Sequence, residues 1–327
     1  MTVPGEALLQ VTDLRMHIHT RRGAVKAVDG VSFALYEGET LGIVGESGSG
    51  KSMLCLSVIG LLPHGARVVD GSVTLSGREL TGLSARELRD VRGSQIAFIP
   101  QDPNTSLDPV FTVGSQLRET LALDGLRSKG ATERATELLK SVRIAAPTER
   151  LRSIPYELSG GTKQRVAGAI ALARSPRVLI ADEPTTALDV TTQAAYLRLL
   201  RDLQRSHGLS IMLVTHDLGV VASACDRVAV MYAGRIVETG PVRDVLERPQ
   251  HPYTRALVAA TPPIDERLDR LAVIEGQPPA LHDVPPGCPF APRCDERVER
   301  CGELPLLVGS GDRAVACWVA QAAGAER

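Results

Sequence analysis

The 327-residue sequence predicts an α/β protein with a parallel β-sheet core, and two observations lead to this fold class. Three short apolar runs, at residues 178–181, 211–214 and 228–231, are separated by helical stretches, which is typical of strands buried in a parallel sheet. In addition, the apolar stretch 41–44 leads directly into a complete phosphate-loop motif, and an apolar helical run follows it. A strand, a glycine-rich loop and a helix in this order belong to the same architecture.

The phosphate loop fills the pattern G-x-x-x-x-G-K-[ST] without a mismatch; it comprises Gly45, Glu46, Ser47, Gly48, Ser49, Gly50, Lys51 and Ser52. Its glycines let backbone N–H groups close around phosphates, and the helix that starts near Gly50 directs its positive dipole end at them. In this motif Lys51 bridges β- and γ-phosphate oxygens, and the Ser52 hydroxyl binds Mg²⁺. A glycine-rich turn with a chance lysine is the alternative, and the flanking strand and helix argue against it.

Other elements surround this core. Residues 8–41 have short alternating runs that predict an antiparallel β layer, and the helix after the phosphate loop is expected to reach about Leu62. A β segment at 72–76 precedes a helix at 84–91 with capping-box spacing, and 95–99 predicts a buried strand. Residues 100–143 have a helical pattern with expected breaks at 124–125 and 129–130.

Composition and charge exclude some classes of protein. The 37 Lys and Arg against 38 Asp and Glu leave a net charge of −1, which does not indicate a nucleic-acid partner. No run approaches 18 apolar residues, and the first ten residues lack a basic and then apolar leader. We therefore expect the chain to stay in the cytoplasm and to act at a membrane only through partners.

Two carboxylates follow the strand at 178–181. Asp182 and Glu183 are expected at the carboxyl edge of the sheet, where the phosphate loop also opens. Asp182 would hold Mg²⁺ directly or through water, and Glu183 would polarise the attacking water. Two acids could simply start a loop, but together with a complete phosphate loop they predict a hydrolytic site.

A second anion site is predicted where Ser159, Gly160 and Gly161 precede a helical run at 165–173. The segment Leu-Ser-Gly-Gly at 158–161, together with the phosphate loop, resembles the ATPase subunit of ABC transporters. This resemblance implies a P-loop NTPase with a parallel-sheet core, an antiparallel β subdomain and a helical subdomain at about 102–175. It also implies a head-to-tail dimer, in which this second site closes on ATP held by the partner's phosphate loop.

Further positions match the same family. Gln101 resembles the glutamine that contacts Mg²⁺ and water and connects to the membrane subunits, and His216 resembles the switch histidine that contacts the γ-phosphate. The segment 186–189, which ends in Asp189, resembles the loop that crosses the dimer interface. Two departures are present: Thr162 replaces the usual glutamine, and residues 15–26 lack the aromatic that stacks on adenine, which leaves base binding open between Arg22 and Val25.

Residues 101–109 and 251–257 resemble segments of oligopeptide and dipeptide importer ATPases. The resemblance implies ATP hydrolysis that powers peptide uptake through two separate transmembrane permease subunits, supplied by an extracellular solute-binding protein. It further implies a second ABC ATPase subunit in a heterodimer, and a peripheral location on the cytoplasmic face of the membrane. A soluble ABC ATPase acting on ribosomes or DNA, a regulatory member, and an importer of nickel or a sugar are the alternatives.

Four of the six cysteines, Cys288, Cys294, Cys301 and Cys317, lie near the C-terminus with C-x5-C-x6-C-x15-C spacing. Four thiolates between Pro and Gly turns suit either Zn²⁺ or a [4Fe–4S] cluster, and the peptide-importer resemblance of residues 286–294 favours the cluster. Cys55 and Cys225 are expected in the core. Proline density places a domain boundary near residue 262, so we expect an ABC nucleotide-binding domain at 1–261 and a small Cys-rich extension at 262–327.

Overall fold

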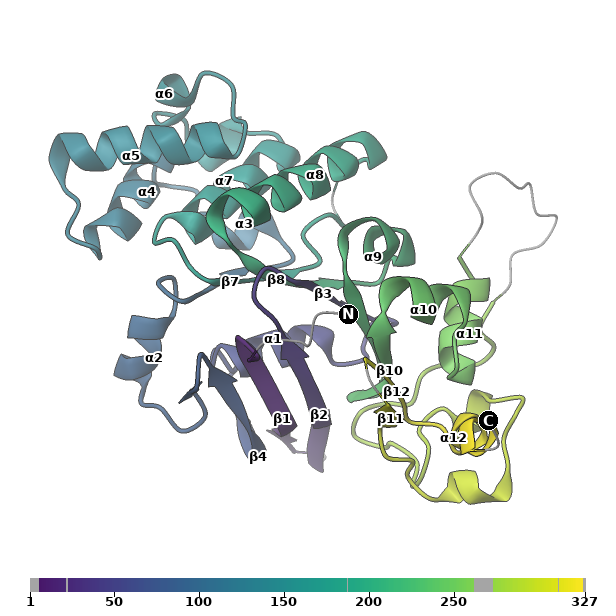
Figure 1. Cartoon of the computed structure of the whole chain (residues 1–327). Helices are drawn as coiled ribbons and strands as arrows, with labels where there is room; N and C mark the ends of the chain where they lie inside the picture. The colour runs from purple at the N-terminus through teal and green to yellow at the C-terminus, as the bar shows by residue number, and fades with distance from the viewer. Residues whose placement is uncertain (1–5, 22, 187, 262–272, 311, 326–327) are drawn as a thin grey trace. The chain divides into compact units, whose positions relative to one another are not determined.

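The computed structural model describes residues 6–21, 23–186, 188–261, 273–310 and 312–325. The chain divides into two compact units (Figure 1). Unit 1 contains Tyr36–Glu39 and Leu83–Val214, and unit 2 contains Glu6–Leu35, Thr40–Gly82 and the chain from Thr215 onward. The predicted boundary at 262 lies outside the described residues, and the name C-terminal extension is used below for residues 273–310 and 312–325.

Unit 1 is built on three parallel strands, with β7 (Val178–Asp182) between β6 (Ile96–Ile99) and β8 (Ser210–Thr215). Every residue of β7 and β8 is buried, as the continuous apolar runs predicted. Its helices are α2 (Ala85–Val91), α3 (Pro103–Ser106), α4 (Val113–Ala122), α5 (Ser128–Ser141), α6 (Pro147–Arg150), η1 (Pro155–Glu157), α7 (Gly160–Leu172) and α8 (Val190–His207). The parallel strands of the sequence prediction are confirmed.

Helices α4, α5 and α7 contact one another in unit 1 (Figure 1). The buried residues of α5 are Ala131, Ala135, Leu138 and Leu139, which form one face of the helix. The expected break at 124–125 separates α4 from α5, but the expected break at 129–130 is wrong, because both residues lie inside α5. The buried face of α5 outweighs the roughly 1 kcal/mol that one glycine costs a helix.

The capping box at the start of α2 is confirmed. Ser84 Oγ accepts from the Glu87 N–H at 3.3 Å, and Glu87 Oε2 accepts from the Ser84 N–H at 2.9 Å. Each side chain therefore satisfies a backbone donor that the helix itself leaves without a partner.

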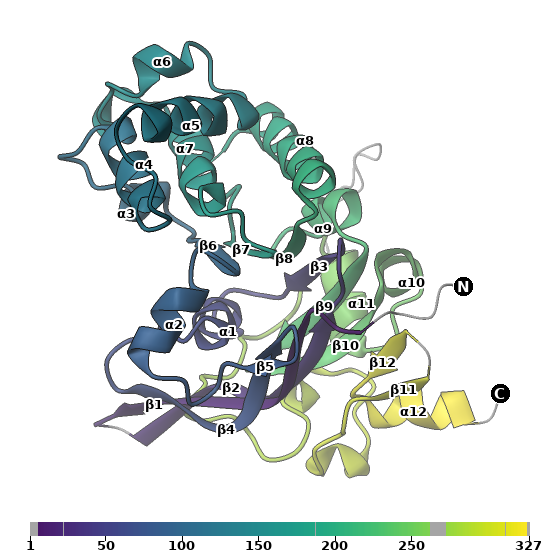
Figure 2. The same ribbon diagram turned by 60° about the vertical axis from the view of Figure 1, so that its left-hand side comes forward.

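Unit 2 contains the predicted antiparallel β layer, whose strands β1 and β2 contact α1 of the same unit (Figure 2). Its strand order is β2 (Gly23–Leu35), β1 (Leu9–Thr20), β4 (Ala66–Leu75) and β5 (Arg78–Glu79). All neighbouring pairs in this sheet are antiparallel, which confirms the prediction for residues 8–41.

A second set of strands in unit 2 carries the phosphate loop. β3 (Thr40–Val44) is parallel to β9 (Arg227–Tyr232), and β10 (Arg235–Pro241) is antiparallel to β9. β12 (Arg313–Val315) pairs with β10, and β11 (Val308–Ser310) pairs with β12. The C-terminal extension thus adds two strands to this sheet, which the sequence did not predict.

The helices of unit 2 are α1 (Lys51–Val58), α9 (Leu218–Ala224), α10 (Val242–Glu247), α11 (Pro252–Ala259), η2 (Ala291–Arg293), η3 (Glu299–Gly302) and α12 (Trp318–Ala325). The expected extension of α1 to Leu62 is wrong. Gly60 has φ of +63°, its N–H donates to Ser57 O, and the Leu61 N–H donates to Leu56 O. This pair of bonds is a Schellman motif, which ends the helix at a left-handed glycine.

The core of unit 2 joins the phosphate-loop strand to the C-terminal extension. One buried cluster contains Val44 of β3, Tyr232 of β9, Tyr253 of α11 and Phe290 of the extension. The ring centroids of Tyr232 and Tyr253 are 4.5 Å apart, and each lies 5.4 Å from the ring of Phe290. These aromatic contacts make the extension an integral part of this core.

Within the ranges given above, no helix has both the length and the apolar character needed to cross a membrane.

Candidate functional site

The phosphate loop connects β3 to α1 in unit 2. Gly48 and Gly50 have φ of +81° and +101°, a left-handed conformation that favours glycine. A Cβ on Gly45 would lie 2.1 Å from the Met231 carbonyl oxygen, and one on Gly50 would lie 2.1 Å from the Ala27 carbonyl oxygen. The loop therefore lies directly against the backbones of β9 and β2, and only glycine fits at these two positions.

Lys51 closes the loop. Its Nζ donates to Gly45 O at 2.8 Å and to Glu46 O at 2.9 Å, and the residue is only 5% exposed. Ser52 is the second residue of α1, whose N-cap is Gly50. Ser49 Oγ is buried, and no group in the described ranges bonds to it. A buried hydroxyl without a partner in a glycine-rich loop at a helix N-terminus fits a site that a phosphate completes.

Glu46 is contacted by two residues that the sequence analysis did not assign to this site. The Tyr253 hydroxyl accepts from the Glu46 N–H at 2.9 Å, and Arg293 of the extension donates to both carboxylate oxygens of Glu46. Tyr253 and Arg293 lie in the segments 251–257 and 286–294, which the sequence analysis singled out only for their family resemblance and without a role at the phosphate loop. Their contact with the loop is a product of the tertiary fold.

In unit 1, the structure brings Glu183 and Gln101 together. Asp182 ends β7 and Glu183 follows it, and both are buried. Glu183 Oε2 accepts from Gln101 Nε2 at 3.1 Å and from Thr186 Oγ1 at 3.0 Å, while its N–H donates to Val214 O. Its φ of +44° is unusual for a residue other than glycine and indicates a backbone held in place by its surroundings.

His216 belongs to unit 2, where it follows β8 and is exposed. Its neighbours fix the backbone on both sides, since the Asp217 N–H donates to Thr215 Oγ1 at 3.0 Å. Asp217 in turn caps α9 by accepting from the Gly219 N–H at 2.7 Å. The phosphate loop and His216 thus lie in unit 2, and Asp182, Glu183 and Gln101 lie in unit 1.

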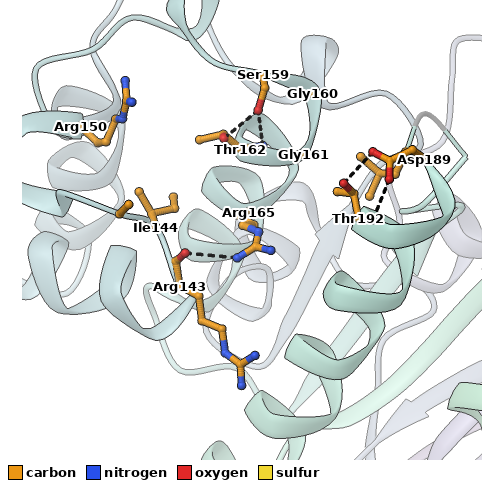
Figure 3. Close-up of a pocket in the computed structure, with 12 residues that line it drawn as sticks. Arg143, Ile144, Arg150, Ser159, Gly160, Gly161, Thr162, Arg165, Asp189 and Thr192 are labelled. Atoms are coloured by element: carbon orange, nitrogen blue, oxygen red, sulfur yellow. Dashed lines mark hydrogen bonds between the residues drawn. The ribbon is translucent and has the colours of Figure 1, made fainter.

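The residues of the predicted second anion site line a pocket of about 500 Å³ in unit 1 (Figure 3). Ser159 caps α7, and its Oγ lies 2.9 Å from Thr162 Oγ1. Thr162, which stands where a glutamine is expected, therefore forms a hydrogen bond with Ser159 itself. Gly160 and Gly161 form the first turn of the helix, and a Cβ on Gly161 would lie 2.9 Å from Thr192 Cγ2 of α8.

Charge in this pocket is mainly positive. Arg143, Arg150 and Arg165 line it, and Asp189 is its one acidic lining residue. Asp189 caps α8 and accepts from the Thr192 N–H at 3.0 Å and from Thr192 Oγ1 at 2.7 Å. These hydrogen bonds lower the pKa of Asp189. Three arginines and a helix N-terminus make the pocket suitable for an anion.

The candidates for base binding are Arg22 and Val25. Arg22 lies outside the described residues, as does Ala187 of the predicted interface loop. Val25 lies on β2 and is half-buried.

The four C-terminal cysteines line one small cavity in unit 2, together with His251, Phe290 and Trp318. All four are free thiols; Cys294 is half-buried and the other three are buried. Burial raises the pKa of Cys288 to about 11. In the part of the chain that the structure describes, no three or more Cys, His, Asp or Glu side chains are arranged to hold a metal ion. The geometry therefore gathers the thiols around one cavity without a formed ligand set.

Cys55 is buried in α1 and is a core residue, as predicted. Cys225 is half-buried and packs against the core cluster of unit 2 without being fully enclosed in it.

Comparison with known proteins gives two family matches. Residues 28–186 match the ABC transporter family, and residues 237–301 match the oligopeptide/dipeptide transporter C-terminal region. The chain is 47% identical to a dipeptide transport ATP-binding protein, DppD, of Bacillus subtilis, over 96% of this chain and 95% of that protein. It is 48% identical to the oligopeptide transport ATP-binding protein OppD of Escherichia coli, over 92% and 90% of the two chains.

Comparison with solved structures also identifies an ATP-binding cassette. A dimeric ATP-binding cassette in a post-hydrolysis state, bound to ADP and Pi, is 29% identical and superposes with a TM-score of 0.65 over 72% of this chain and 99% of that one.

Proposed function

The chain belongs to the ABC transporter family, among the oligopeptide and dipeptide transport ATP-binding proteins, and we propose that it hydrolyses ATP to power peptide uptake through separate membrane subunits. The observation that carries this proposal is the similarity of nearly the whole chain, C-terminal region included, to dipeptide and oligopeptide transport ATP-binding proteins. An ATPase without a transport role would not need the transporter-specific region at 237–301.

In this proposal the residues of the phosphate loop and those at the end of β7 have separate roles in ATP hydrolysis. Lys51 and the phosphate loop would bind the β- and γ-phosphates, and Ser52, Asp182 and Gln101 would hold Mg²⁺. Mg²⁺, when bound, neutralises the charge that develops on the transferred phosphoryl group. Glu183 accepts a proton from the attacking water.

The hydrogen bonds from Gln101 and Thr186 to Glu183 hold its carboxylate in one orientation for that water. His216 is proposed to contact the γ-phosphate.

Ser159, Gly160, Gly161 and Asp189 are proposed to act on the ATP of a second subunit. The pocket they line is rich in arginine and separate from the phosphate loop in the sequence, which suits a head-to-tail dimer. We propose a related ABC ATPase as the second subunit, and two transmembrane permeases that receive peptide from an extracellular binding protein. The chain would then be peripheral, on the cytoplasmic face of the membrane.

We also propose that Cys288, Cys294, Cys301 and Cys317 hold a [4Fe–4S] cluster, with Zn²⁺ as the alternative. Four free thiols around one cavity supply the Cys₄ set that both metals use. Anaerobic purification, a UV–visible spectrum and metal analysis test this. Broad absorbance near roughly 400 nm with about four irons per chain supports the cluster. Stoichiometric zinc supports the alternative, and no metal under protecting conditions contradicts both.

Transport is tested in a host strain that lacks the gene. Uptake of labelled dipeptides and oligopeptides should return with the natural chain and should not return with Lys51→Ala or Glu183→Gln. Lys51→Ala should weaken ATP binding, whereas Glu183→Gln should keep ATP bound in a closed dimer, since only the proton acceptor is lost. Restored uptake of nickel or a sugar without peptide uptake would contradict the peptide assignment, and normal ATP turnover by Glu183→Gln would exclude Glu183 as the base.

A further inference from the structure

The guanidinium of Arg293 makes as many hydrogen bonds as it has N–H donors. Nη1 donates to Glu46 Oε2 at 2.8 Å and to the Tyr232 hydroxyl at 3.2 Å, and Nη2 donates to Glu46 Oε1 at 3.3 Å. Nε donates to Glu275 O at 2.8 Å, and Nη2 also donates to Ile274 O at 3.3 Å. An arginine has five such donors, so the count of hydrogen bonds equals the count of donors and the orientation of the guanidinium plane is fixed.

This arginine is buried. Its side chain is 5% exposed, and that of Glu46 is 26% exposed. Burial acts to lower the pKa of Arg293, but the hydrogen bonds to Glu46 and Tyr232 outweigh it and leave the pKa above its ordinary value. A buried, two-pronged ion pair is one that loses much when a partner is removed, because the remaining charge stays desolvated.

Glu46 transmits this contact to the phosphate-binding lysine. Its side chain is held by Arg293, its N–H by the Tyr253 hydroxyl, and its carbonyl accepts from Lys51 Nζ at 2.9 Å. The same carbonyl accepts from the Ser49 N–H at 3.2 Å. Any shift of Glu46 therefore moves an acceptor of Lys51 and an N–H donor of the loop at once.

The C-terminal extension holds Arg293 in place through packed residues. Arg293 ends η2, directly before Cys294, and Phe290 at the start of η2 packs on Tyr232 and Tyr253. The Cys288 N–H donates to Cys301 O at 2.9 Å, which joins the two loops of the extension behind Arg293. Arg293 is thus presented to the phosphate loop by packed residues of the same unit.

We propose that Arg293 is a positioning residue for ATP, through which the C-terminal extension holds the phosphate loop in the conformation that binds the triphosphate. The proposal rests on ATP binding by this loop, as set out under the proposed function. It assigns to the extension an effect on nucleotide affinity in addition to any role in metal binding or assembly.

Binding of a non-hydrolysable ATP analogue, AMP-PNP with Mg²⁺, to the full chain tests this by calorimetry. Arg293→Gln should raise Kd about 10-fold, which corresponds to about 1.4 kcal/mol. Arg293→Lys keeps the positive charge but loses the planar guanidinium that bonds to both carboxylate oxygens. Its Kd should therefore lie between that of the natural chain and that of Arg293→Gln. Arg300→Gln is the matched control in the same extension, because the Arg300 guanidinium stacks on the Trp318 ring, 3.7 Å from its centroid, rather than on Glu46.

A second set of variants acts from the loop side. Glu46→Gln should raise Kd by a similar factor, and the double variant Glu46→Gln/Arg293→Gln should bind no more weakly than either single variant, because both remove one contact. Hydrogen exchange of the peptide covering residues 42–52, measured without nucleotide, should become faster in Arg293→Gln and not in Arg300→Gln.

The outcomes separate the two proposals. Unchanged AMP-PNP affinity in Arg293→Gln and Glu46→Gln overturns this inference alone, as does an equal loss of affinity in Arg300→Gln. If the natural chain does not bind AMP-PNP, or binds it as well after Lys51→Ala, the proposed function fails and this inference with it.

Discussion

The buried histidine of α11 should make the stability of unit 2 sensitive to mild acid. His251 is 1% exposed, and its Nδ1 accepts from the Tyr253 N–H at 3.0 Å, so its neutral ring carries the proton on Nε2. Its backbone N–H donates to the buried carboxylate of Glu238 at 2.9 Å. Burial, together with the charge of Arg255, lowers the pKa of His251 to about 3, from an ordinary value of 6.5.

The direction of the effect follows from proton uptake. Between pH 6.5 and about pH 3 the unfolded chain protonates this histidine and the folded chain does not. The contribution of neutral His251 to the free energy of unfolding is therefore complete above pH 6.5. Well below pH 6.5 it falls by about 1.4 kcal/mol for each pH unit. From pH 7 to pH 5, this one group should lower the free energy of unfolding by about 2 kcal/mol.

Urea unfolding at pH 7, 6 and 5 measures this, and the single tryptophan is a suitable probe. Trp318 packs against the same core cluster as Tyr253 and Phe290, so its fluorescence reports on this unit. His251→Asn keeps an N-cap acceptor but cannot titrate, and should lose about 2 kcal/mol less than the natural chain between pH 7 and pH 5. His64→Asn, at an exposed position, should behave like the natural chain.

The comparison of slopes removes the contribution of all other titrating groups, because they are common to the variants. Equal slopes for His251→Asn and the natural chain would refute the reasoning, and so would an imidazole NMR titration of His251 near pH 6.5 in the folded protein.

Two further predictions concern backbone and helix ends. Gly45→Ala should abolish ATP binding or folding, because its Cβ would lie 2.1 Å from the Met231 carbonyl oxygen, whereas Gly48→Ala meets no atom within 4 Å and should cost only the roughly 1–2 kcal/mol of a left-handed alanine. Thermal unfolding and nucleotide titration of the two variants compare them, and similar losses would contradict the assigned contact. Ser84→Ala removes the cap of α2 and should lower the free energy of unfolding by about 1 kcal/mol. Ser84→Asp, which keeps an oxygen acceptor at the N-cap, serves as the control, and an equal loss there would count against the capping box.

Local patterns predicted much of the fold. The continuous apolar runs of β7, β8 and β9 require burial on both faces, and the spacing of Ser84 and Glu87 reports on adjacent backbone, so both could be inferred without a structure. The phosphate loop is equally local, because its eight residues bind through their own backbone. The end of α1 was missed because Gly60 acts through a Schellman motif, whose hydrogen bonds the residue pattern alone did not reveal.

Long-range contacts could not be predicted in this way. Arg293 and Glu46 are 247 residues apart, and the pairing of β12 with β10 depends on a short segment with little periodicity. Such contacts are selected by the surrounding packing, which single residues do not encode. The conformation of Glu183, with φ of +44°, is likewise imposed by its neighbours rather than by its own preference.

The separation of Glu46 from Arg293 also has a consequence for synthesis. At roughly 5–20 residues per second, the ribosome adds the intervening chain in about 12 to 50 s. Throughout this interval the nascent phosphate loop has neither its arginine nor the two strands that the extension contributes to the sheet. A nascent chain is therefore expected to bind nucleotide weakly until Arg293 has emerged. Nucleotide-dependent pairing of two subunits would then begin only after the segments that precede Arg293 in the sequence have been synthesised.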